Sequence, residues 1–365
     1  MIELLPWIII LLIIALAGGY VLGRKANSGA TPAPGAPASV PSAGPVVVAN
    51  RPAPPPSGKP PASPVSAGGR SLAPDATAVD VLGQVKTWGY QLQDLNLEKA
   101  AAAAHDLIVI DYAKDGSDDT ALKPKEIERL KRKPDGSRRL VIAYLSIGEA
   151  ESYRFYWQKV WQRQKPAWLL GENPEWEENY SVCFWDPGWQ QLMCGNPQAY
   201  LDRILAQGFD GIYLDKCDVT EDLKQHFKAA AKSRSDLDGD MVAFVTRLSS
   251  YAKAKRPGFV ILMQNAEPLL ERPALRAVID GVAKEELLFG LDAPERPNTK
   301  GEIAESKDLL DLIKDDGKPV LMVEYLDNAA KVRDAAGAAQ RFGYVLYVAP
   351  KDRELDRLMP PPASA

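Results

Sequence analysis

The stretch Gly208-Phe-Asp-Gly-Ile-Tyr-Leu-Asp215 is a short apolar run that begins at a glycine and ends on a carboxylate. Residues 197–207, directly before it, have the pattern of an amphipathic helix. Pro197 suits the first turn of that helix, and Gly208 suits the position just after its end. A helix followed by a continuous apolar run is typical of a parallel strand that is buried on both faces. The stretch therefore predicts an α/β sheet with an acid at the carboxyl end of a strand.

Runs of the same kind recur along the chain, with amphipathic stretches between most of them, at 95–104, 241–254 and 303–315 among others. Eight strands in about 280 residues predict a closed (β/α)₈ TIM barrel. An open doubly wound sheet is the alternative, but no Gly-x-Gly-x-x-Gly loop follows the first run, as a dinucleotide site would need. The predicted strands are residues 87–92, 107–111, 140–146, 211–215, 259–264, 277–283, 319–325 and 344–349.

The N-terminal fifth of the chain, residues 1–74, differs in composition from the rest. Residues 4–23 carry no charge and, as a helix, would span about 30 Å, the thickness of a bilayer core. We therefore predict a single transmembrane anchor at residues 1–25; a cleaved signal peptide is the alternative, with Ala-Leu-Ala at 15–17 as a weak cleavage site. Residues 26–74 hold 13 of the 30 prolines and no aromatic or acidic residue, which predicts a disordered tether.

The remaining chain is predicted to be one barrel domain at residues 75–358, followed by a disordered tail at 359–365. A long tether between an anchor and a domain favours a barrel on the periplasmic or extracellular side of the membrane. Arg24 and Lys25, which follow the anchor, point the other way under the positive-inside rule, although two charges are a weak signal. The pattern does not fix the oligomeric state.

Composition excludes several classes of protein. The formal net charge of −4 is too small to indicate nucleic acid as a partner. Three cysteines are too few for a disulfide scaffold, although Cys183 and Cys194 could pair if the domain were exported. Cys217 has no histidine nearby in sequence to act as its base, so we interpret it as a packing residue.

Acidic residues gather at the ends of the predicted strands, where a TIM barrel builds its active site. Carboxylates in one pocket repel each other and raise their pKa values, which suits general acid catalysis. A pair of carboxylates flanking a bond is typical of glycoside hydrolases, and an acidic pocket also attracts a cationic substrate. Oxygen ligands for Mg²⁺ or Ca²⁺ are an alternative use. These acids are Asp111, Glu149, Glu151, Asp215, Asp218, Glu267, Glu285, Glu286 and Glu324.

The stretch between the third and fourth predicted strands is far longer than one helix needs. It contains six of the eight tryptophans, at positions 157, 161, 168, 176, 185 and 189. Aromatic faces suit the apolar faces of sugar rings, but most of these six are expected to form the core of an excursion domain. Tyr153, Arg154 and Trp157 lie closest to the third strand and are the candidates for sugar contacts.

Six pieces of the chain resemble glycoside hydrolase family 114, the endo-α-1,4-polygalactosaminidase-like TIM barrels. They are Trp88-Gly-Tyr-Gln-Leu92, Leu107-Ile-Val-Ile-Asp-Tyr112, Ala143-Tyr-Leu-Ser-Ile-Gly-Glu-Ala-Glu-Ser-Tyr-Arg154, Gly208-Phe-Asp-Gly-Ile-Tyr-Leu-Asp215, Gln264-Asn-Ala-Glu267 and Lys284-Glu-Glu-Leu287. The resemblance implies an endo-acting hydrolase of α-1,4-linked galactosamine polymers, with catalytic acids matching Asp215 and Glu285. The doublet Glu285-Glu286 departs from the family pattern, and strand alternation puts only one of these two side chains into the pocket.

By analogy with other α-glycosidase barrels, the resemblance implies a retaining mechanism with Asp215 as nucleophile and Glu285 as acid/base; a wider separation of the two carboxyls would favour inversion. No cofactor and no resident metal is implied. The alternatives are a membrane-tethered polysaccharide-binding protein without catalysis, and a hydrolase of another amino-sugar exopolysaccharide. The substrate-binding residues are expected to be Asp111, Tyr112, Glu149, Tyr153, Arg154, Trp157, Asp218, Asn265, Glu267, Glu286 and Glu324.

Overall fold

The computed structural model describes residues 76–174 and 176–361. The predicted anchor and tether lie outside these residues, as do the last four residues of the predicted tail. In the two described ranges, no helix has both the length and the apolar character needed to cross a membrane.

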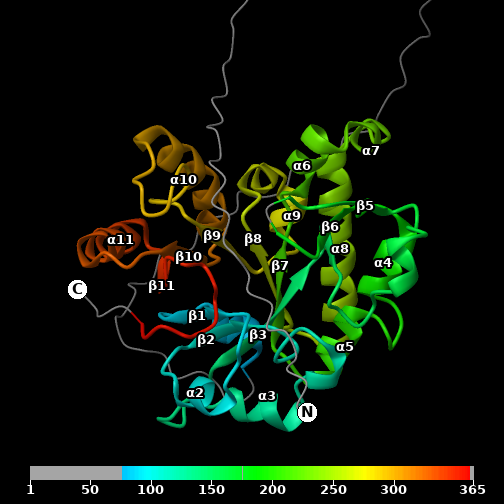
Figure 1. Cartoon of the computed structure of the whole chain (residues 1–365). Helices are drawn as coiled ribbons and strands as arrows, with labels where there is room; N and C mark the ends of the chain where they lie inside the picture. The colour runs from blue at the N-terminus through cyan, green and yellow to red at the C-terminus, as the bar shows by residue number, and fades with distance from the viewer. Residues whose placement is uncertain (1–75, 175, 362–365) are drawn as a thin grey trace, which may run out of the picture. The chain divides into compact units, whose positions relative to one another are not determined.

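Eight parallel strands form one sheet that curls into a nearly closed barrel (Figure 1). Each strand pairs in parallel with the next in the spatial order β1-β2-β3-β7-β8-β9-β10-β11. The predicted (β/α)₈ barrel is therefore confirmed. The strands are β1 (Trp88–Gln91), β2 (Leu107–Ile110), β3 (Leu140–Ser146), β7 (Gly211–Asp215), β8 (Val260–Gln264), β9 (Gly281–Glu285), β10 (Val320–Tyr325) and β11 (Val345–Ala349).

Helices surround the strands (Figure 1). The predicted end of one helix at Gly208 is confirmed: this glycine caps α5 with a left-handed φ of 94°, which side-chain-bearing residues rarely adopt. The helices are α1 (Ala78–Leu82), α2 (Leu97–Ala102), α3 (Pro124–Leu130), α4 (Pro187–Met193), α5 (Tyr200–Gln207), α6 (Val219–His226), α7 (Lys228–Lys232), α8 (Leu237–Lys255), α9 (Pro273–Arg276), α10 (Lys300–Asp315) and α11 (Ala329–Phe342), with 3₁₀ turns η1 (Asp118–Thr120), η2 (Lys159–Gln162) and η3 (Glu267–Glu271).

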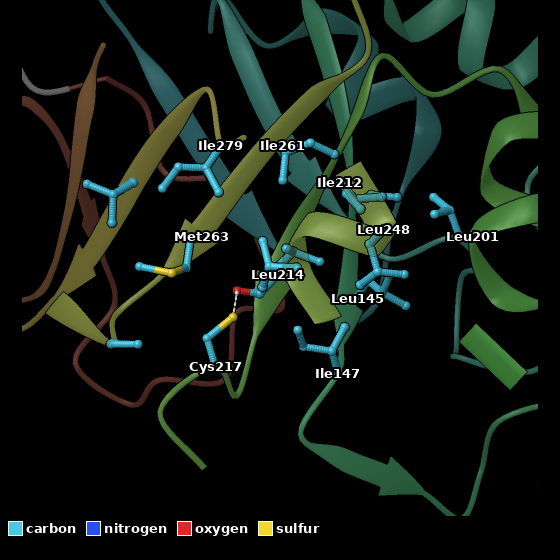
Figure 2. Packing of buried hydrophobic residues seen from close by; sticks show 14 of the residues in the cluster. Leu145, Ile147, Leu201, Ile212, Leu214, Cys217, Leu248, Ile261, Met263 and Ile279 are labelled. Carbon is cyan, nitrogen blue, oxygen red and sulfur yellow. Dashed lines mark hydrogen bonds between the residues drawn. The ribbon is translucent and has the colours of Figure 1, made fainter. Parts of the chain in front are cut away.

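Side chains alternate along each strand between the barrel lumen and the layer under the helices. Ile212, Leu214 and Ile261 point outward and pack with Leu201 of α5 and Leu248 of α8, and Figure 2 shows this outer layer from close by. The same view shows the Cys217 thiol directed at the Leu214 carbonyl, 3.8 Å away, in the packing position predicted for it. The opposite faces of the strands fill the lumen with Trp88, Tyr90, Tyr213, Tyr347 and their aliphatic neighbours.

The excursion between β3 and β7 contains a three-stranded antiparallel sheet of β4 (Glu149–Glu151), β6 (Asn179–Val182) and β5 (Leu169–Glu172). Trp161, Trp168 and Trp189 are buried, and their rings contact one another in series at centroid distances of 5.1 and 5.2 Å. These three tryptophans therefore form the core of the excursion, as expected.

The sixth predicted strand begins four residues too early. Pro273 starts the short helix α9, and Ala277 caps its end, so these residues cannot be extended. The Asp280 carboxylate then accepts the Ile261 backbone N–H at 2.8 Å, which fixes the point where β9 begins. The strand runs from Gly281 to Glu285, so Glu285 is its last residue and does not belong to the following loop.

The seam between β1 and β11, the two ends of the strand order, is closed by side-chain and tail contacts. The Trp88 indole N–H donates to the Val345 carbonyl at 2.9 Å. Residues 350–361 run along the same seam, where the Leu92 N–H donates to the Leu355 carbonyl at 2.8 Å and the Gln91 amide to the Asp356 carbonyl at 2.7 Å. Met359, the first residue of the predicted tail, donates its N–H to the Tyr347 hydroxyl.

Replacing Trp88 with Phe should weaken this closure. The change leaves the Val345 carbonyl without its donor and removes ring volume from the lumen, so the free energy of unfolding should fall by about 1–3 kcal/mol. Urea denaturation of the full chain measures it. Trp176→Phe, at an indole that is 54% exposed, is the control and should change stability by less than about 0.5 kcal/mol. Equal losses in both variants would show that the indole bond does not hold the seam.

Candidate active site

Polar side chains form the last lumen layer at the carboxyl ends of the strands. Asp215 ends β7, Gln264 ends β8, Glu285 ends β9 and Tyr325 ends β10, and alternation turns all four inward. Below them lie the rings of Tyr213 and its aromatic neighbours, which exclude water from the floor. Two acids from β7 and β9 therefore face the same lumen.

Asp215 is held by two neutral donors. The Tyr144 hydroxyl of β3 donates to Oδ2 at 2.6 Å, and the Lys216 backbone N–H donates to Oδ1 at 2.7 Å. The protein surrounds this carboxyl, which keeps partial access to solvent at the open end of the lumen. Burial, followed by the charge of Glu285, raises the pKa of Asp215 to about 6. Glu285 therefore lies close enough for its charge to act on Asp215.

Glu285 is held on both oxygens, again by neutral groups. The Tyr325 hydroxyl donates to Oε1, while the side-chain amides of Gln264 and Asn265 donate to Oε2, the latter at 3.2 Å. The Asn265 side-chain oxygen in turn accepts the Glu285 backbone N–H at 3.1 Å. Burial raises the pKa of Glu285 in spite of these donors. None of the groups that hydrogen bond to Asp215 or Glu285 through these atoms carries a positive charge.

The chain turns sharply just after β7, β8 and β9. Lys216, Asn265, Ala266 and Glu286 all have left-handed backbones, with φ of 59°, 51°, 54° and 55°. Such conformations are uncommon for residues with side chains and cluster at functional sites. Here they bend the backbone away immediately after the last inward-facing residue. None of the four is a glycine, and Asn265 alone is of a residue type that favours this conformation, so the sequence gives little sign of these turns.

Gly148 explains why the segment Ser-Ile-Gly at 146–148 lies beside Asp215. A methyl group at Gly148 would overlap the Lys216 carbonyl and the Val219 side chain. The Ile147 N–H donates to the Asp215 carbonyl at 3.1 Å. Only a glycine lets these two loops approach so closely, and the approach fixes the backbone that carries Asp215.

The structure brings together Asp111, Glu151, Tyr153 and Arg154 as one ion-pair cluster. The Arg154 guanidinium contacts Asp111 and Glu151, each at 2.6 Å, and the residue is only 4% exposed. The Tyr153 hydroxyl donates to Glu151 at 2.6 Å, while 40% of Tyr153 remains exposed. Arg154 is thus committed to two carboxylates, and Tyr153 presents the open surface of the cluster. Glu151, which organises the cluster, is absent from the predicted substrate-binding set.

Other predicted binding residues lie around the excursion. Glu149 pairs with the Lys216 ammonium at 3.2 Å and accepts the Asn173 amide at 2.9 Å. Tyr112 points away from the lumen, and its ring contacts that of Tyr200 with the ring centroids 4.9 Å apart. Trp157 packs on Tyr180, with their ring centroids 4.8 Å apart. Asp218 precedes α6, and burial raises its pKa to about 6.

Glu267 and Glu324 are not brought to the Asp215–Glu285 pair. Glu324 lies between the inward-facing Val323 and Tyr325, so alternation turns it outward. There it accepts the N–H groups of Leu288 and Phe289 at 2.8 and 3.2 Å, and burial raises its pKa to about 8. Glu267 pairs at 3.0 Å with Lys284, the outward neighbour of Glu285. Both acids brace β9 and the loop after it from outside the lumen.

The doublet at 285–286 is separated by the backbone turn at its second residue. Glu285 faces the lumen with the donors described above, whereas Glu286 pairs with Arg353. The structure thus agrees with the prediction that only one of the two side chains enters the lumen, and that side chain is Glu285.

The three cysteines are free thiols, so the predicted option of a Cys183–Cys194 disulfide is not formed. Among residues 76–174 and 176–361, no group of three or more His, Cys, Asp or Glu side chains is arranged to hold a metal ion.

Comparison with known proteins places the chain in a family. The model of glycoside-hydrolase family GH114 matches residues 69–363. An uncharacterised protein of Methanocaldococcus jannaschii is 41% identical over 285 residues, which cover 74% of this chain and 77% of that protein. An uncharacterised protein of Deinococcus radiodurans is 37% identical over 284 residues, covering 76% of this chain and 84% of that protein.

Among solved structures, the glycoside hydrolase domain of PelA from Pseudomonas aeruginosa has a TM-score of 0.55 at 21% identity, covering 75% of this chain and 97% of that domain. This likeness shows a shared barrel fold. The extent of the family match and the identity to the relatives establish more than the fold: the chain belongs to glycoside-hydrolase family GH114.

Proposed function

We propose that this glycoside hydrolase cleaves α-1,4-linked galactosamine-containing polysaccharide at internal bonds, with Asp215 and Glu285 as its catalytic pair. The observation that carries the proposal is the placement of these two acids in one lumen layer, where the charge of Glu285 raises the pKa of Asp215. Paired carboxyls are the usual apparatus of glycoside hydrolysis, and membership of family GH114 supports the polymer class.

The two carboxyls favour a state that holds one proton between them. Burial disfavours two negative charges in the same lumen, and each charge raises the affinity of the other group for a proton. When one acid is protonated, the other ionises more readily. A pair with one proton is what a retaining glycosidase needs at the start of its cycle.

In the proposed cycle, protonated Glu285 donates its proton to the glycosidic oxygen while an Asp215 oxygen attacks the anomeric carbon. The bond to the leaving sugar breaks, and a covalent glycosyl-enzyme ester forms on Asp215. Ionised Glu285 then takes a proton from water, whose oxygen attacks the same carbon and releases Asp215. Tyr144 and the Lys216 N–H hold the attacking carboxylate, and Tyr325, Gln264 and Asn265 hold the acid/base. The division of roles follows analogy with other α-glycosidase barrels.

The charge of the site supports a cationic amino sugar as substrate. The hydrogen-bond donors on both catalytic carboxyls are neutral, so an ionised carboxylate of the pair gives the lumen mouth a negative potential, which the charge of Lys216 offsets only in part. Such a potential attracts ammonium groups and repels anionic polymers. Tyr153, which exposes part of its ring on the Arg154 cluster, offers an aromatic surface for a sugar ring.

We also propose that residues 1–25 anchor the enzyme in a membrane and that residues 26–74 tether the barrel on the periplasmic or extracellular side. The apolar length of 4–23 and the composition of the tether support this arrangement. It would place the barrel among extracellular polysaccharides.

Asp215→Asn and Glu285→Gln should each lower kcat on an α-1,4-galactosamine polymer by at least about 10³-fold, because each removes a group that acts in bond cleavage. Mass analysis of released oligosaccharides measures the loss. Glu221→Gln, an exposed acid of α6, is the matched control and should retain full activity. Unchanged turnover in Asp215→Asn would remove this residue from the mechanism. Binding of the polymer by the unmodified chain without any cleavage would favour the non-catalytic alternative.

Asp215→Asn should also stabilise the fold at neutral pH. Because the pKa of Asp215 is raised from 3.8 to about 6, the folded chain keeps a proton that the unfolded chain releases between these values. The contribution of Asp215 to stability is therefore complete below pH 4 and lost as the pH rises through 6. The uncharged amide avoids this loss, so the variant should gain about 1–3 kcal/mol above pH 6 and nothing near pH 3.5.

Denaturant titrations of both chains between pH 3.5 and 8 measure this difference. Glu221→Gln again serves as the control, with no pH-dependent gain expected. An Asp215→Asn gain that does not vary with pH would contradict the raised pKa.

A further inference from the structure

An arginine from the C-terminal segment lies at the open end of the barrel. Arg353 forms an ion pair with Glu286, and its guanidinium carbon lies 5.7 Å from the centre of the Tyr325 ring. The hydroxyl of that same tyrosine donates to Glu285. A cation therefore rests against a carboxylate and an aromatic ring, one residue away from a proposed catalytic acid. Carboxylates and aromatic rings are the groups that recognise cations.

Glu286 is the fixed member of the pair. Its backbone N–H donates to the Val323 carbonyl at 2.9 Å, and its carbonyl accepts the Asn298 amide at 2.8 Å. A methyl group at Gly290 would overlap the Glu286 carboxylate, so the side chain is packed tightly against that glycine. Gly290 has a φ of 111°, which also favours glycine there.

Arg353 is held much less firmly. Its side chain is 36% exposed, against 18% for Glu286. Within the described residues, its guanidinium contacts the Glu286 carboxylate and the Tyr325 ring. The residue has a left-handed backbone, with φ of 61°, in a segment without helix or strand. Of the two side chains in the pair, that of Arg353 is therefore the one with more access to solvent.

Departure of Arg353 would leave the Glu286 carboxylate without its ion-pair partner in a largely enclosed position, where only the charge of Lys284, which pairs with Glu267, still acts on it. Burial raises the pKa of Glu286, and Arg353 acts against this rise. An unpaired charge in such a place is costly, so without the guanidinium the carboxyl either takes up a proton or pairs with another cation, and only a cation keeps it ionised. An ammonium group satisfies this requirement, whereas an acetamide or a hydroxyl does not.

We propose that Glu286 and the Tyr325 ring form a cation subsite, that Arg353 fills it in the free enzyme, and that the ammonium group of an amino-sugar unit replaces the guanidinium. The inference rests on the proposed function and deepens it. The subsite selects de-N-acetylated units over N-acetylated ones, because only the former carry the charge that Glu286 needs.

Isothermal titration calorimetry on the full chain tests whether a substrate ammonium group replaces the Arg353 guanidinium. Every protein in this experiment carries Asp215→Asn, so that the oligomers are bound but not cleaved. The two probes are α-1,4-linked oligomers of equal length, one of galactosamine and one of N-acetylgalactosamine. Arg353→Gln removes the competing cation and should tighten binding of the amine oligomer by about three- to tenfold. Glu286→Gln should weaken it by a similar factor. Binding of the N-acetylated oligomer should change less than about twofold in both.

Arg357→Gln is the matched control. This arginine lies in the same segment, its side chain is 49% exposed, and it pairs with Asp352 and Asp356 instead of Glu286. It should leave the affinity for both oligomers unchanged. Arg353→Lys keeps a cation at the position, so its affinity for the amine oligomer should stay near that of the parent.

Several results would overturn the inference. Weaker binding of both oligomers in Arg353→Gln, with a lower unfolding temperature, would show that the pair only braces the fold. Equal effects of Glu286→Gln on the two oligomers, or no binding of either oligomer to the parent, would also refute the subsite. Hydrolysis by the chain with intact Asp215 is assayed separately. Failure of hydrolysis with the binding pattern intact would refute the proposed function and leave the subsite standing.

Discussion

Two carboxyl groups share the mouth of one barrel, and neutral donors alone hold them in place. Asp215 and Glu285 accept hydrogen bonds from tyrosine hydroxyls, amides and a backbone N–H, and the rings of Trp88, Tyr90 and Tyr213 form the floor beneath them. Because this floor consists of uncharged rings and aliphatic side chains, it supplies no charge that compensates the carboxyls. The arrangement costs stability and leaves each acid sensitive to the charge of the other. That sensitivity is the property that acid and nucleophile catalysis needs.

Three of the other acids support this layer from outside the lumen. Glu324 and the Glu267–Lys284 pair support β9 and its loop from outside, while Glu149 pairs with Lys216, the residue after Asp215. The left-handed turns after β7, β8 and β9 then direct the chain away from the lumen. Strain and ion pairs around the mouth thus fix the direction of two side chains, as expected for a site built on the ends of rigid strands.

Much of this fold is legible in the sequence because buried parallel strands are continuous apolar runs. The strands β3 and β7 have the predicted bounds, and Gly208 ends the helix that precedes β7. Alternation along β10 would also have turned Glu324 outward, since its neighbours Val323 and Tyr325 face the lumen. The donors Tyr144, Gln264 and Tyr325 were missed because they lie inside the apolar runs, and only register across neighbouring strands shows that they reach an acid.

Long-range contacts were beyond the sequence for a different reason. Arg353 lies 67 residues from Glu286, and no local pattern links a C-terminal arginine to a strand end. Arg154 was expected to hold sugar because it is polar and close to β3, but its two buried carboxylate partners come from the tertiary fold. Which charged residues pair across the barrel depends on which loops contact each other. Those contacts depend in turn on close backbone approaches, such as that of Gly148 to Lys216.

Trapping of the covalent intermediate tests the central claim most directly. Glu285→Gln would be incubated with an α-galactosaminide oligomer whose aryl leaving group needs no proton, and the digested protein would be examined by mass spectrometry. The account predicts a glycosyl adduct on the peptide that contains Asp215, because the first step needs only the nucleophile while the second lacks its base. Release of the aryl group with the adduct on another residue, or with inverted product and no adduct, would contradict it.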